Sequence, residues 1–493
     1  MRQIKFIDTT IRDGQASLWA MNMRTHHMLP AMPLLDEAGF DQMEFLAAGS
    51  RLKKFVRHLA EDPWDWIKLG AEAAKKTQLR WHGYISSDSM SGNVPSEVGE
   101  LLIRKVVDLG ITYTRTGNNW NDFAAAGVEK QRLENLGMTP VINVMYSVSP
   151  RHTDAYFLDK ARQAAALAPW RLCFKDVGGL LTPERTRELL PRMIAAAGDI
   201  PWEFHGHCNN GLGPLNAIEA VKAGVSYVHT AVPPLANGNS QPSVFNVAEN
   251  LRALGYGVDL DEAPLHAVQE HFDWVAEREG FPKGVPAEFD QRLYSHQIPG
   301  GMISNLEHQL KLAGVGDRLE ETLEETGRVR ADLGYPIMVT PLSQFVGSQA
   351  AINVIVGERY QQVSDAVIEY ALGRHGGEEA LSNMDPDVRA KILDRPRARE
   401  LERFERPDPT LAELRQRYGQ DISDEHLILR AIVGDDAVDV IRDAPRRQPA
   451  APGEQPLVCL IRELANDPGH RHVALSMSGL SVTMRKSDAS RGG

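Results

Sequence analysis

The 493-residue chain has few cysteines and few aromatic residues, and it has no long apolar run. Its three cysteines, Cys173, Cys208 and Cys459, cannot build a disulfide framework, and no C-x-x-C pair is present. No window approaches the roughly 18 consecutive apolar residues of a membrane-spanning helix. The amino-terminal residues enter a strand pattern directly, so we expect no signal peptide. These absences predict a protein of the reducing cytoplasm.

Positive charge is also in short supply. The chain has 54 Lys and Arg against 66 Asp and Glu, which gives a formal net charge of −12. This acidic balance argues against a surface for nucleic acid or for an anionic membrane. Hydrophobic residues make up 42% of the chain, which is ordinary for a globular protein. The length exceeds a single typical core, so we expect two or three domains.

The first 255 residues alternate short apolar runs with longer amphipathic stretches. Eight strands are expected, at 4–8, 42–46, 79–84, 113–117, 141–148, 171–177, 202–207 and 227–232. Helices are expected at 62–76, 96–109, 154–168, 183–197 and 215–223. Eight strands that are mostly followed by helices predict an α/β protein with a (β/α)8 TIM barrel. A doubly wound sheet is disfavoured, because no G-x-G-x-x-G follows the first strand.

The pattern after Gly255 changes to helices, which we expect at 307–312, 317–333, 342–356, 364–372 and 386–392. We therefore predict a barrel over 1–260 and a helical carboxyl-terminal domain over 261–442. Residues 443–456 are rich in proline and predict a semi-rigid linker. The remaining tail, 457–493, predicts a helix over 457–466 and a hairpin of 473–477 with 480–484.

Two segments far apart in the sequence carry the strongest signal of chemistry. His205 and His207 alternate along one strand, so both side chains point to the same side. Asp13 follows the first strand, and barrel enzymes keep their sites at the carboxyl ends of the strands. An isolated H-x-H is a weak signal, but two nitrogens and a carboxylate at two strand ends favour a divalent metal. Zinc, manganese and cobalt all suit such ligands.

Three further residues leave alternatives open. Lys175, at the end of the sixth strand, fits a metal site if it forms a Schiff base or is carbamylated by CO2. An ion pair with Asp176 is about equally plausible. Arg12 could steady a carboxylate or an enolate oxygen, or it could be a surface arginine. Thr340 is expected to be a helix N-cap before Pro341.

Several motifs together resemble one family. The opening follows D-T-T-x-R-D-G, and Phe174-Lys175-Asp176 ends the sixth strand. The runs 298–306 and 339–347 contain Pro-Gly-Gly and Val-Thr-Pro. Two shorter motifs, 24–26 and 61–64, agree with them. About residues 1–440 resemble the carboxyltransferase domains and subunits of biotin-dependent enzymes: pyruvate carboxylase, the oxaloacetate decarboxylase α subunit and the transcarboxylase carboxyltransferase subunit. These belong to a wider set of metal-dependent barrels that includes isopropylmalate synthase and hydroxymethylglutaryl-CoA lyase.

The resemblance implies a role for each matching residue. The implied metal ligands are Asp13, His205, His207 and a carbamylated Lys175. Thr340 would pass a proton between biotin and the enol, Arg12 would lie beside the metal aspartate, and Arg80 would bind the substrate carboxylate. The metal would stabilise an enolate while CO2 moves between carboxybiotin and a 2-oxo acid such as pyruvate or oxaloacetate.

The chain departs from the family around the acceptor. Where the family has R-D-A-H-Q-S, this sequence has Arg12-Asp13-Gly14-Gln15-Ala16-Ser17. The substrate-contacting glutamine is thus replaced by Ala16 or displaced to Gln15. The loops after the second, third and fourth strands differ as well, so the acceptor and the direction stay open. A biotin-independent metal lyase or aldolase, acting by retro-Claisen or retro-aldol cleavage, is the alternative. A non-enzymatic paralogue is disfavoured, because all four metal ligands are present.

The sequence contains no biotinyl domain. No A-M-K-M occurs, and the tail is too short for the carrier fold. The resemblance therefore implies biotin on a separate biotin carboxyl carrier protein, and a biotin carboxylase subunit as a further partner. Because the family often forms dimers, we also expect a homodimer.

Overall fold

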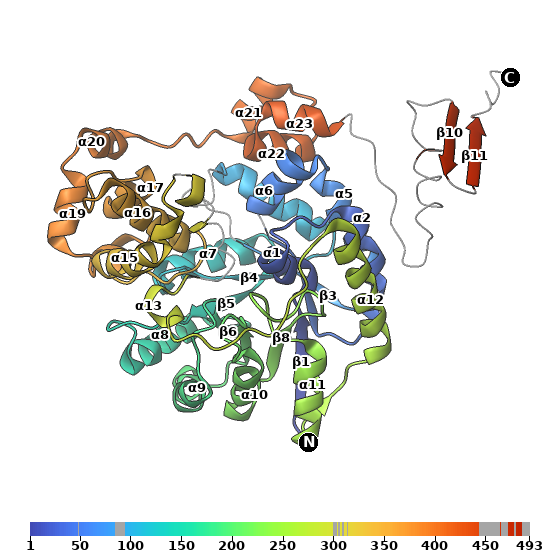
Figure 1. Ribbon diagram of the computed structural model, residues 1–493, viewed down its shortest axis with the longest axis horizontal. Coiled ribbons are helices and arrows are strands. Elements are labelled where there is room, and N and C mark those ends of the chain that lie inside the picture. The colour runs from blue at the N-terminus through green and yellow to red at the C-terminus, as the bar shows by residue number, and fades with distance from the viewer. Residues whose placement is uncertain are drawn as a thin grey trace.

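The computed structural model of the protein describes most of the chain (Figure 1). The described residues are 1–47, 49–83, 94–298, 303, 306–307, 310–312, 314–442, 464, 472–477 and 480–485. The expected linker 443–456, almost all of the expected helix 457–466, most of the Pro-Gly-Gly run and part of the expected helix 307–312 lie outside them.

Eight parallel strands close into a barrel, as the sequence predicts. Their order is β2-β3-β4-β5-β6-β7-β8-β1, and a further pairing of β1 with β2 completes the ring. The strands are β1 (Gln3–Asp8), β2 (Gln42–Ala47), β3 (Gln78–His82), β4 (Tyr113–Thr116), β5 (Thr139–Met145), β6 (Arg171–Asp176), β7 (Trp202–Gly206) and β8 (Tyr227–Thr230). The short β9 (Gly257–Val258) pairs with β1. The predicted strands are confirmed to within three residues at each described end.

Helices surround the barrel, and four of those that follow the strands begin at side-chain caps. Asp62 accepts a hydrogen bond from the Trp64 amide at 2.9 Å, with Pro63 at the first helical position, so the predicted cap is confirmed. Asp122, Thr153 and Thr182 cap the later helices in the same way. The helices that follow the strands are α4 (Ser50–Lys54), α5 (Pro63–Ala73), α6 (Ser96–Asp108), α7 (Phe123–Asn135), α8 (Asp154–Ala166), α9 (Pro183–Ala197), α10 (Gly213–Ala223) and α11 (Val244–Ala253). Three short helices, α1 (Gln15–Leu18), α2 (Thr25–Met28) and α3 (Met32–Glu37), lie between β1 and β2.

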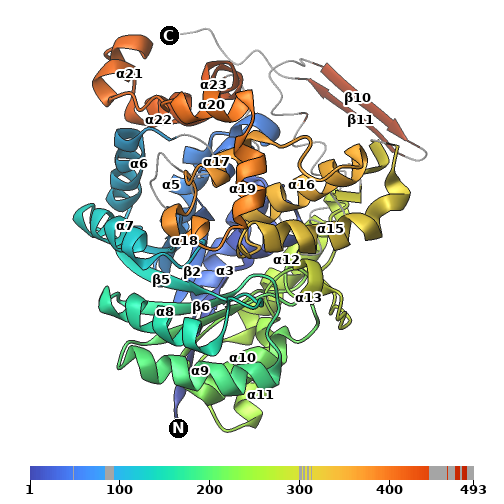
Figure 2. The same cartoon turned by 90° about the vertical axis from the view of Figure 1, so that its left-hand side faces the viewer.

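The remaining helices divide between two apolar cores. The barrel core includes apolar residues of α12 (Glu262–Glu279), α21 (Leu411–Tyr418), α22 (Asp424–Val433) and α23 (Asp435–Arg442). A second core joins α15 (Leu319–Asp332), α16 (Leu342–Val356), α17 (Asp365–Ala371), α18 (Gly377–Leu381), α19 (Pro386–Leu393) and α20 (Pro396–Arg403). In Figures 1 and 2, α15–α20 form one group beside the barrel, while α21–α23 lie over α5 and α6. Helices α12 and α21–α23 pack on the barrel core, although they follow residue 260 in the sequence. The domain boundaries at residues 260 and 442 stay a prediction.

The second core also reaches the mouth of the barrel. It includes Trp120, from the loop after β4, and Met145, at the end of β5. The carbonyl oxygen of Thr340 accepts a hydrogen bond from Asn119 Nδ2 at 3.5 Å. The expected N-cap role of Thr340 is wrong: Pro341 occupies the cap position of α16 without a side-chain cap bond, and Thr340 is exposed. The helix begins one residue later than expected, because Pro341, with φ of −94° and ψ of 3°, is itself the non-helical residue directly before α16.

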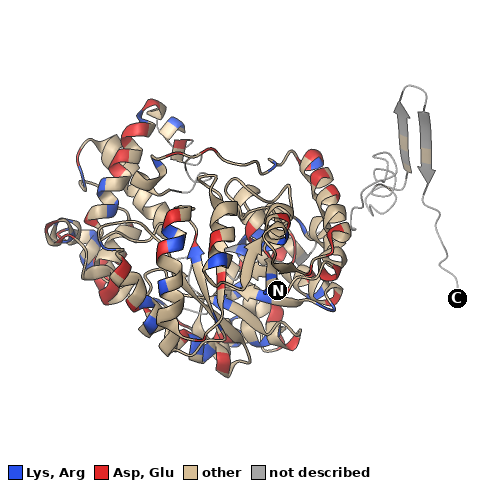
Figure 3. Cartoon of the chain, turned by 90° about the horizontal axis from the view of Figure 1, so that it is seen from below, with Lys and Arg blue, Asp and Glu red and all other residues tan. Residues whose placement is uncertain are grey.

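The hairpin predicted for the tail is present in the structure. Strands β10 (His472–Met477) and β11 (Leu480–Arg485) pair antiparallel, which confirms the predicted hairpin. Acidic and basic residues are interspersed along the outer helices (Figure 3). Within the described residues, no helix combines the length and the apolar character that crossing a membrane requires.

Candidate active site

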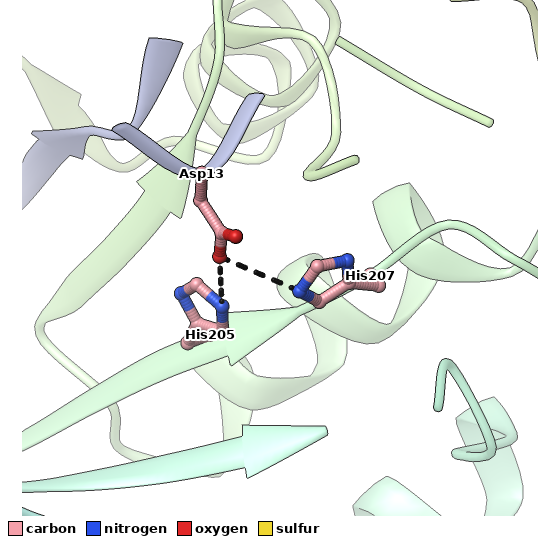
Figure 4. A group of neighbouring side chains, drawn as sticks. All are labelled: Asp13, His205 and His207. Carbon is pink, nitrogen blue, oxygen red and sulfur yellow. Dashed lines mark ion pairs between the residues drawn. The ribbon is translucent and has the colours of Figure 1, made fainter. Parts of the chain in front are cut away.

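Asp13, His205 and His207 converge at the carboxyl ends of the barrel strands (Figure 4). Asp13 lies on a short π-helical turn, Thr10–Gly14, directly after β1. His205 lies on β7 and His207 follows it. Asp13 Oδ2 is 2.9 Å from His205 Nε2 and 3.5 Å from His207 Nε2. The predicted juxtaposition of the three residues is therefore present in the structure.

The donor set of this group fits a divalent metal. The three ligand atoms lie within 4.8 Å of one another. His207 Nδ1 is 2.6 Å from the carbonyl oxygen of Asn239, and because that oxygen only accepts, Nδ1 carries the proton and Nε2 keeps its lone pair. Two imidazole nitrogens and one carboxylate oxygen match the usual ligands of zinc and similar ions.

Gln241 bridges the three ligand atoms, and no motif of the sequence singles it out. Its Nε2 lies 3.0 Å from Asp13 Oδ2, 3.0 Å from His207 Nε2 and 3.3 Å from His205 Nε2. Its Oε1 accepts from Thr9 Oγ1 at 2.8 Å. The only signal that could have found Gln241 is its position in the loop after β8, which belongs to the same barrel end.

Two deeper groups have similar dimensions but are closed by arginines. They are Glu44 with His205 and His229, and Cys173 with Glu203 and His229. Glu44 Oε1 accepts from Arg115 Nε at 2.7 Å, and Glu203 accepts two hydrogen bonds from Arg80. Both glutamates are 0% exposed, whereas Asp13 is 9% and His207 6% exposed. Of the three groups, the one at the mouth is thus the one that a substrate can reach.

Lys175 is at the same barrel end. Its Cα pairs with that of His205 between β6 and β7, and the residue is 7% exposed. Burial, assisted by the nearby Arg115, lowers the pKa of Lys175 to about 7. A large share of this amine is therefore neutral at neutral pH, and only the neutral form attacks CO2 or a carbonyl group.

The ion pair of Lys175 with Asp176 is a wrong expectation. Within the described part of the chain no such pair is found, because successive strand residues point to opposite sides. The Asp176 carboxylate instead accepts hydrogen bonds from the amides of Leu180 and Leu181, at 2.9 and 2.8 Å. Burial still raises the pKa of Asp176 to about 6.

Arg12 is not a surface residue, so that alternative is also wrong. Its Nε donates to Glu44 Oε2 at 2.6 Å, and its Nη2 lies 2.8 Å from Asp13 Oδ2. Burial alone would raise the pKa of Asp13, but Arg12 and His207 hold it well below its usual range. Asp13 therefore stays ionised, as a metal ligand must.

Arg80 and Gln15 are not brought to the mouth group. Arg80 Nη1 and Nη2 donate to the two oxygens of Glu203 at 2.8 and 2.7 Å, and both residues are fully buried. Gln15 Nε2 donates to the Ile11 carbonyl at 2.6 Å, and its Oε1 accepts from the Met23 amide at 3.2 Å. The substrate roles given to these two residues stay predictions.

A (β/α)8 barrel with candidate metal ligands at its strand ends defines a metal-dependent barrel enzyme. Comparison with known families narrows the class. Residues 293–453 match the conserved carboxylase domain, and residues 122–271 match the HMGL-like family. A pyruvate carboxylase subunit of Methanocaldococcus jannaschii is 34% identical over 394 residues, which cover 79% of this chain and 68% of that protein. The methylmalonyl-CoA carboxyltransferase 5S subunit of Propionibacterium freudenreichii is 28% identical over 394 residues, 78% of this chain and 76% of that one.

The fold agrees with these relatives. The carboxyl transferase domain of Rhizobium etli pyruvate carboxylase superposes with a TM-score of 0.75 at 22% identity, covering 90% of this chain and 77% of that one. The chain belongs to the carboxyltransferase family of the biotin-dependent carboxylases. It is a carboxyltransferase, and the family implies both a divalent metal and biotin on a carrier.

Proposed function

We propose that the chain is a carboxyltransferase subunit that moves CO2 between carboxybiotin, held on a separate carrier protein, and the enolate of a 2-oxo acid. The carrying observation is the mouth group of Asp13, His205 and His207, with Lys175 on the neighbouring strand. The names of two relatives, a pyruvate carboxylase subunit and the large subunit of a 2-oxoglutarate carboxylase, support a 2-oxo acid as the acceptor.

The residues of the mouth divide the work. Asp13, His205, His207 and a carbamylated Lys175 would hold the divalent ion, which would polarise the 2-oxo group when bound. Arg12, fixed by Glu44 and Asp13, would place a permanent positive charge beside the developing enolate oxygen. Thr340, exposed on the segment that contacts the loop after β4, would move the proton between biotin and the enol.

The acceptor pocket differs from the family pattern, and the local packing offers part of the reason. The side-chain amide of Gln15 bonds to the backbone at Ile11 and Met23, and its role in place of the missing glutamine stays a prediction. At Gly14 a Cβ atom would lie only 2.8 Å from the carbonyl oxygen of Leu235, too close for the alanine of the family motif. Because the relatives include a pyruvate carboxylase subunit and a 2-oxoglutarate carboxylase subunit, pyruvate and oxaloacetate are the first acceptors to test, and 2-oxoglutarate is the next.

The same proposal extends to the partners and to the compartment. Biotin would arrive on a biotin carboxyl carrier protein that a biotin carboxylase subunit recharges. The protein would act in the cytoplasm as a homodimer, with zinc, manganese or cobalt in the site.

A transfer assay tests this function. Purified protein is mixed with a biotinylated carrier charged with ¹⁴C-carboxybiotin, and label is followed into pyruvate or 2-oxoglutarate. We expect transfer, a loss of about 100-fold or more in Thr340→Ala, and near-normal transfer in Thr340→Ser. Thr410→Ala, which removes the exposed cap of α21, is the control and should leave the rate unchanged. No transfer to any 2-oxo acid together with an unaffected Thr340→Ala would refute the proposal. Substrate cleavage without carrier would identify a lyase or aldolase instead.

A further inference from the structure

A line of hydrogen bonds runs from the candidate ligand His205 into the floor of the barrel. His205 Nε2 faces Asp13 Oδ2, while its Nδ1 lies 3.0 Å from Nδ1 of His229 on β8. His229 Nε2 lies 3.0 Å from Glu203 Oε2 on β7. All three residues of this line, His205, His229 and Glu203, are buried.

Glu203, at the end of the line, sets the direction of the protons when His229 is neutral. Glu203 takes two hydrogen bonds from Arg80 and a third from Arg171 at 3.3 Å, so its carboxylate is ionised and can only accept. His229 Nε2 must therefore carry a proton. A neutral His229 then has a bare Nδ1, and the Nδ1 of His205 must supply the proton between the two rings. This leaves the Nε2 lone pair of His205 facing the ionised Asp13 carboxylate 2.9 Å away, so that a metal cation rather than a proton would lie between the two acceptor atoms.

We propose that Glu203, acting through His229, is a positioning pair that holds His205 in its Nδ1-protonated tautomer and so aims its Nε2 lone pair at the metal. The proposal rests on the metal-dependent function above and adds two residues that do not themselves touch substrate or metal. It also gives Arg80 a structural task, which is to keep the Glu203 carboxylate in place.

His207 reaches the same tautomer by a different route. Its Nδ1 donates directly to the backbone carbonyl of Asn239. A backbone carbonyl is present whatever the side chain, whereas the partner of His205 depends on two side chains. Outer hydrogen-bond partners of metal-bound histidines typically contribute about 10- to 100-fold in metal affinity. The contribution of the Glu203–His229 pair to metal affinity can therefore be measured by substituting these side chains.

Zinc affinity of the full-length protein, measured without substrate by competition with a chromophoric chelator, tests the pair. His229→Leu removes the acceptor for His205 and should weaken zinc binding about 10- to 100-fold. His229→Asn, whose amide oxygen can replace Nδ1 as acceptor, should stay within about 3-fold of the wild type. His271→Asn, which alters a buried histidine of α12 bonded to the His27 carbonyl, is the matched control and should not change affinity.

A second readout does not depend on any variant at position 229 folding. In metal-free protein labelled with ¹⁵N-histidine, the His205 signals, assigned by their loss in His205→Gln, should show a proton on Nδ1. A proton on Nε2 in the wild type, or equal zinc affinity in folded His229→Leu, would overturn the proposal. Failure of the proposed function would look different: zinc binding would still respond to His229→Leu, but no carboxyl group would be transferred.

Discussion

Two layers inside one barrel treat charge in opposite ways. The mouth group of Asp13, His205 and His207 is partly accessible, and its three ligand atoms lie within 4.8 Å of one another. The floor group of Glu44, Arg80, Arg115 and Glu203 is fully buried, and every carboxylate in it is paired with an arginine. Burying a charge is costly unless it is paired, and in the floor group each charge has a partner of opposite sign. Function requires the reverse at the mouth, where ligand atoms must stay available.

The largest effect that separates the layers is expected at Lys175. Lys175→Ala should lower carboxyl transfer by at least about 100-fold while leaving the free energy of unfolding unchanged or slightly raised, because a buried amine is removed. In wild-type protein supplied with ¹³C-bicarbonate, a carbamate signal in the ¹³C NMR spectrum should grow as the pH rises through about 7, since only the neutral amine reacts.

A buried lysine outside the mouth provides the control for that experiment. Lys160, on α8, is also buried but lies beside Glu379, 3.2 Å from its carboxylate. Lys160→Ala should leave transfer unchanged. Full activity in Lys175→Ala, combined with no carbamate signal at pH 8, would remove Lys175 from the site.

Substitutions in the floor group should lower the free energy of unfolding. Arg80→Leu leaves the buried Glu203 carboxylate without its two strongest donors, and we expect a loss of about 3–5 kcal/mol in the free energy of unfolding measured with urea. The double variant Arg80→Leu/Glu203→Leu should lose clearly less than the sum of the two single variants, because no charge is then left unpaired.

An exposed pair gives the scale for comparison. Lys68 and Glu425 form a 2.7 Å ion pair at the surface, and Lys68→Ala should cost less than about 1 kcal/mol. If Arg80→Leu cost equally little free energy of unfolding, or if the losses of the two single variants simply added in the double variant, the charges of the floor group would not depend on one another as described above.

The mouth group could be predicted from the sequence alone, whereas the floor group could not. The strands are predictable because buried runs alternate with amphipathic stretches. Asp13, His205 and His207 can be placed together because a barrel brings all strand ends to one face. The class of enzyme follows from the motifs around Lys175 and Thr340.

The floor could not be predicted, although its residues occupy inward strand positions. Arg80 and Glu203 are 123 residues apart, and Arg115 and Glu44 are 71 apart. Which inward residues meet across a barrel depends on the tilt and stagger of strands that are not neighbours. For this reason the sequence motifs point Arg80 toward a substrate carboxylate, and they give Glu203 and His229 no role.

The smallest expected effect concerns Asp8, a buried carboxylate of β1 that belongs to neither layer. Its Oδ1 accepts from the amide and hydroxyl of Thr10, and burial raises its pKa from 3.8 to about 7. The folded state thus binds more protons than the unfolded state between about pH 4 and pH 7, and stability falls as the pH rises through that window. Asp8→Asn should remove this loss, so its advantage over the wild type should grow from pH 4 to about 1–3 kcal/mol at pH 8.

Asp36 supplies the opposite case when the same urea series is extended down to pH 2. Burial would raise its pKa, but the amides of Thr77, Lys75 and Lys76 hold it below the usual value. Below about pH 4 the folded state then binds fewer protons than the unfolded one, so Asp36 stabilises the fold above that pH and loses its contribution as the pH falls further. Asp36→Asn should accordingly be most destabilising at high pH, the reverse of Asp8→Asn. Parallel pH profiles for the two variants would show that hydrogen bonding does not decide which buried carboxylates of this barrel stay charged.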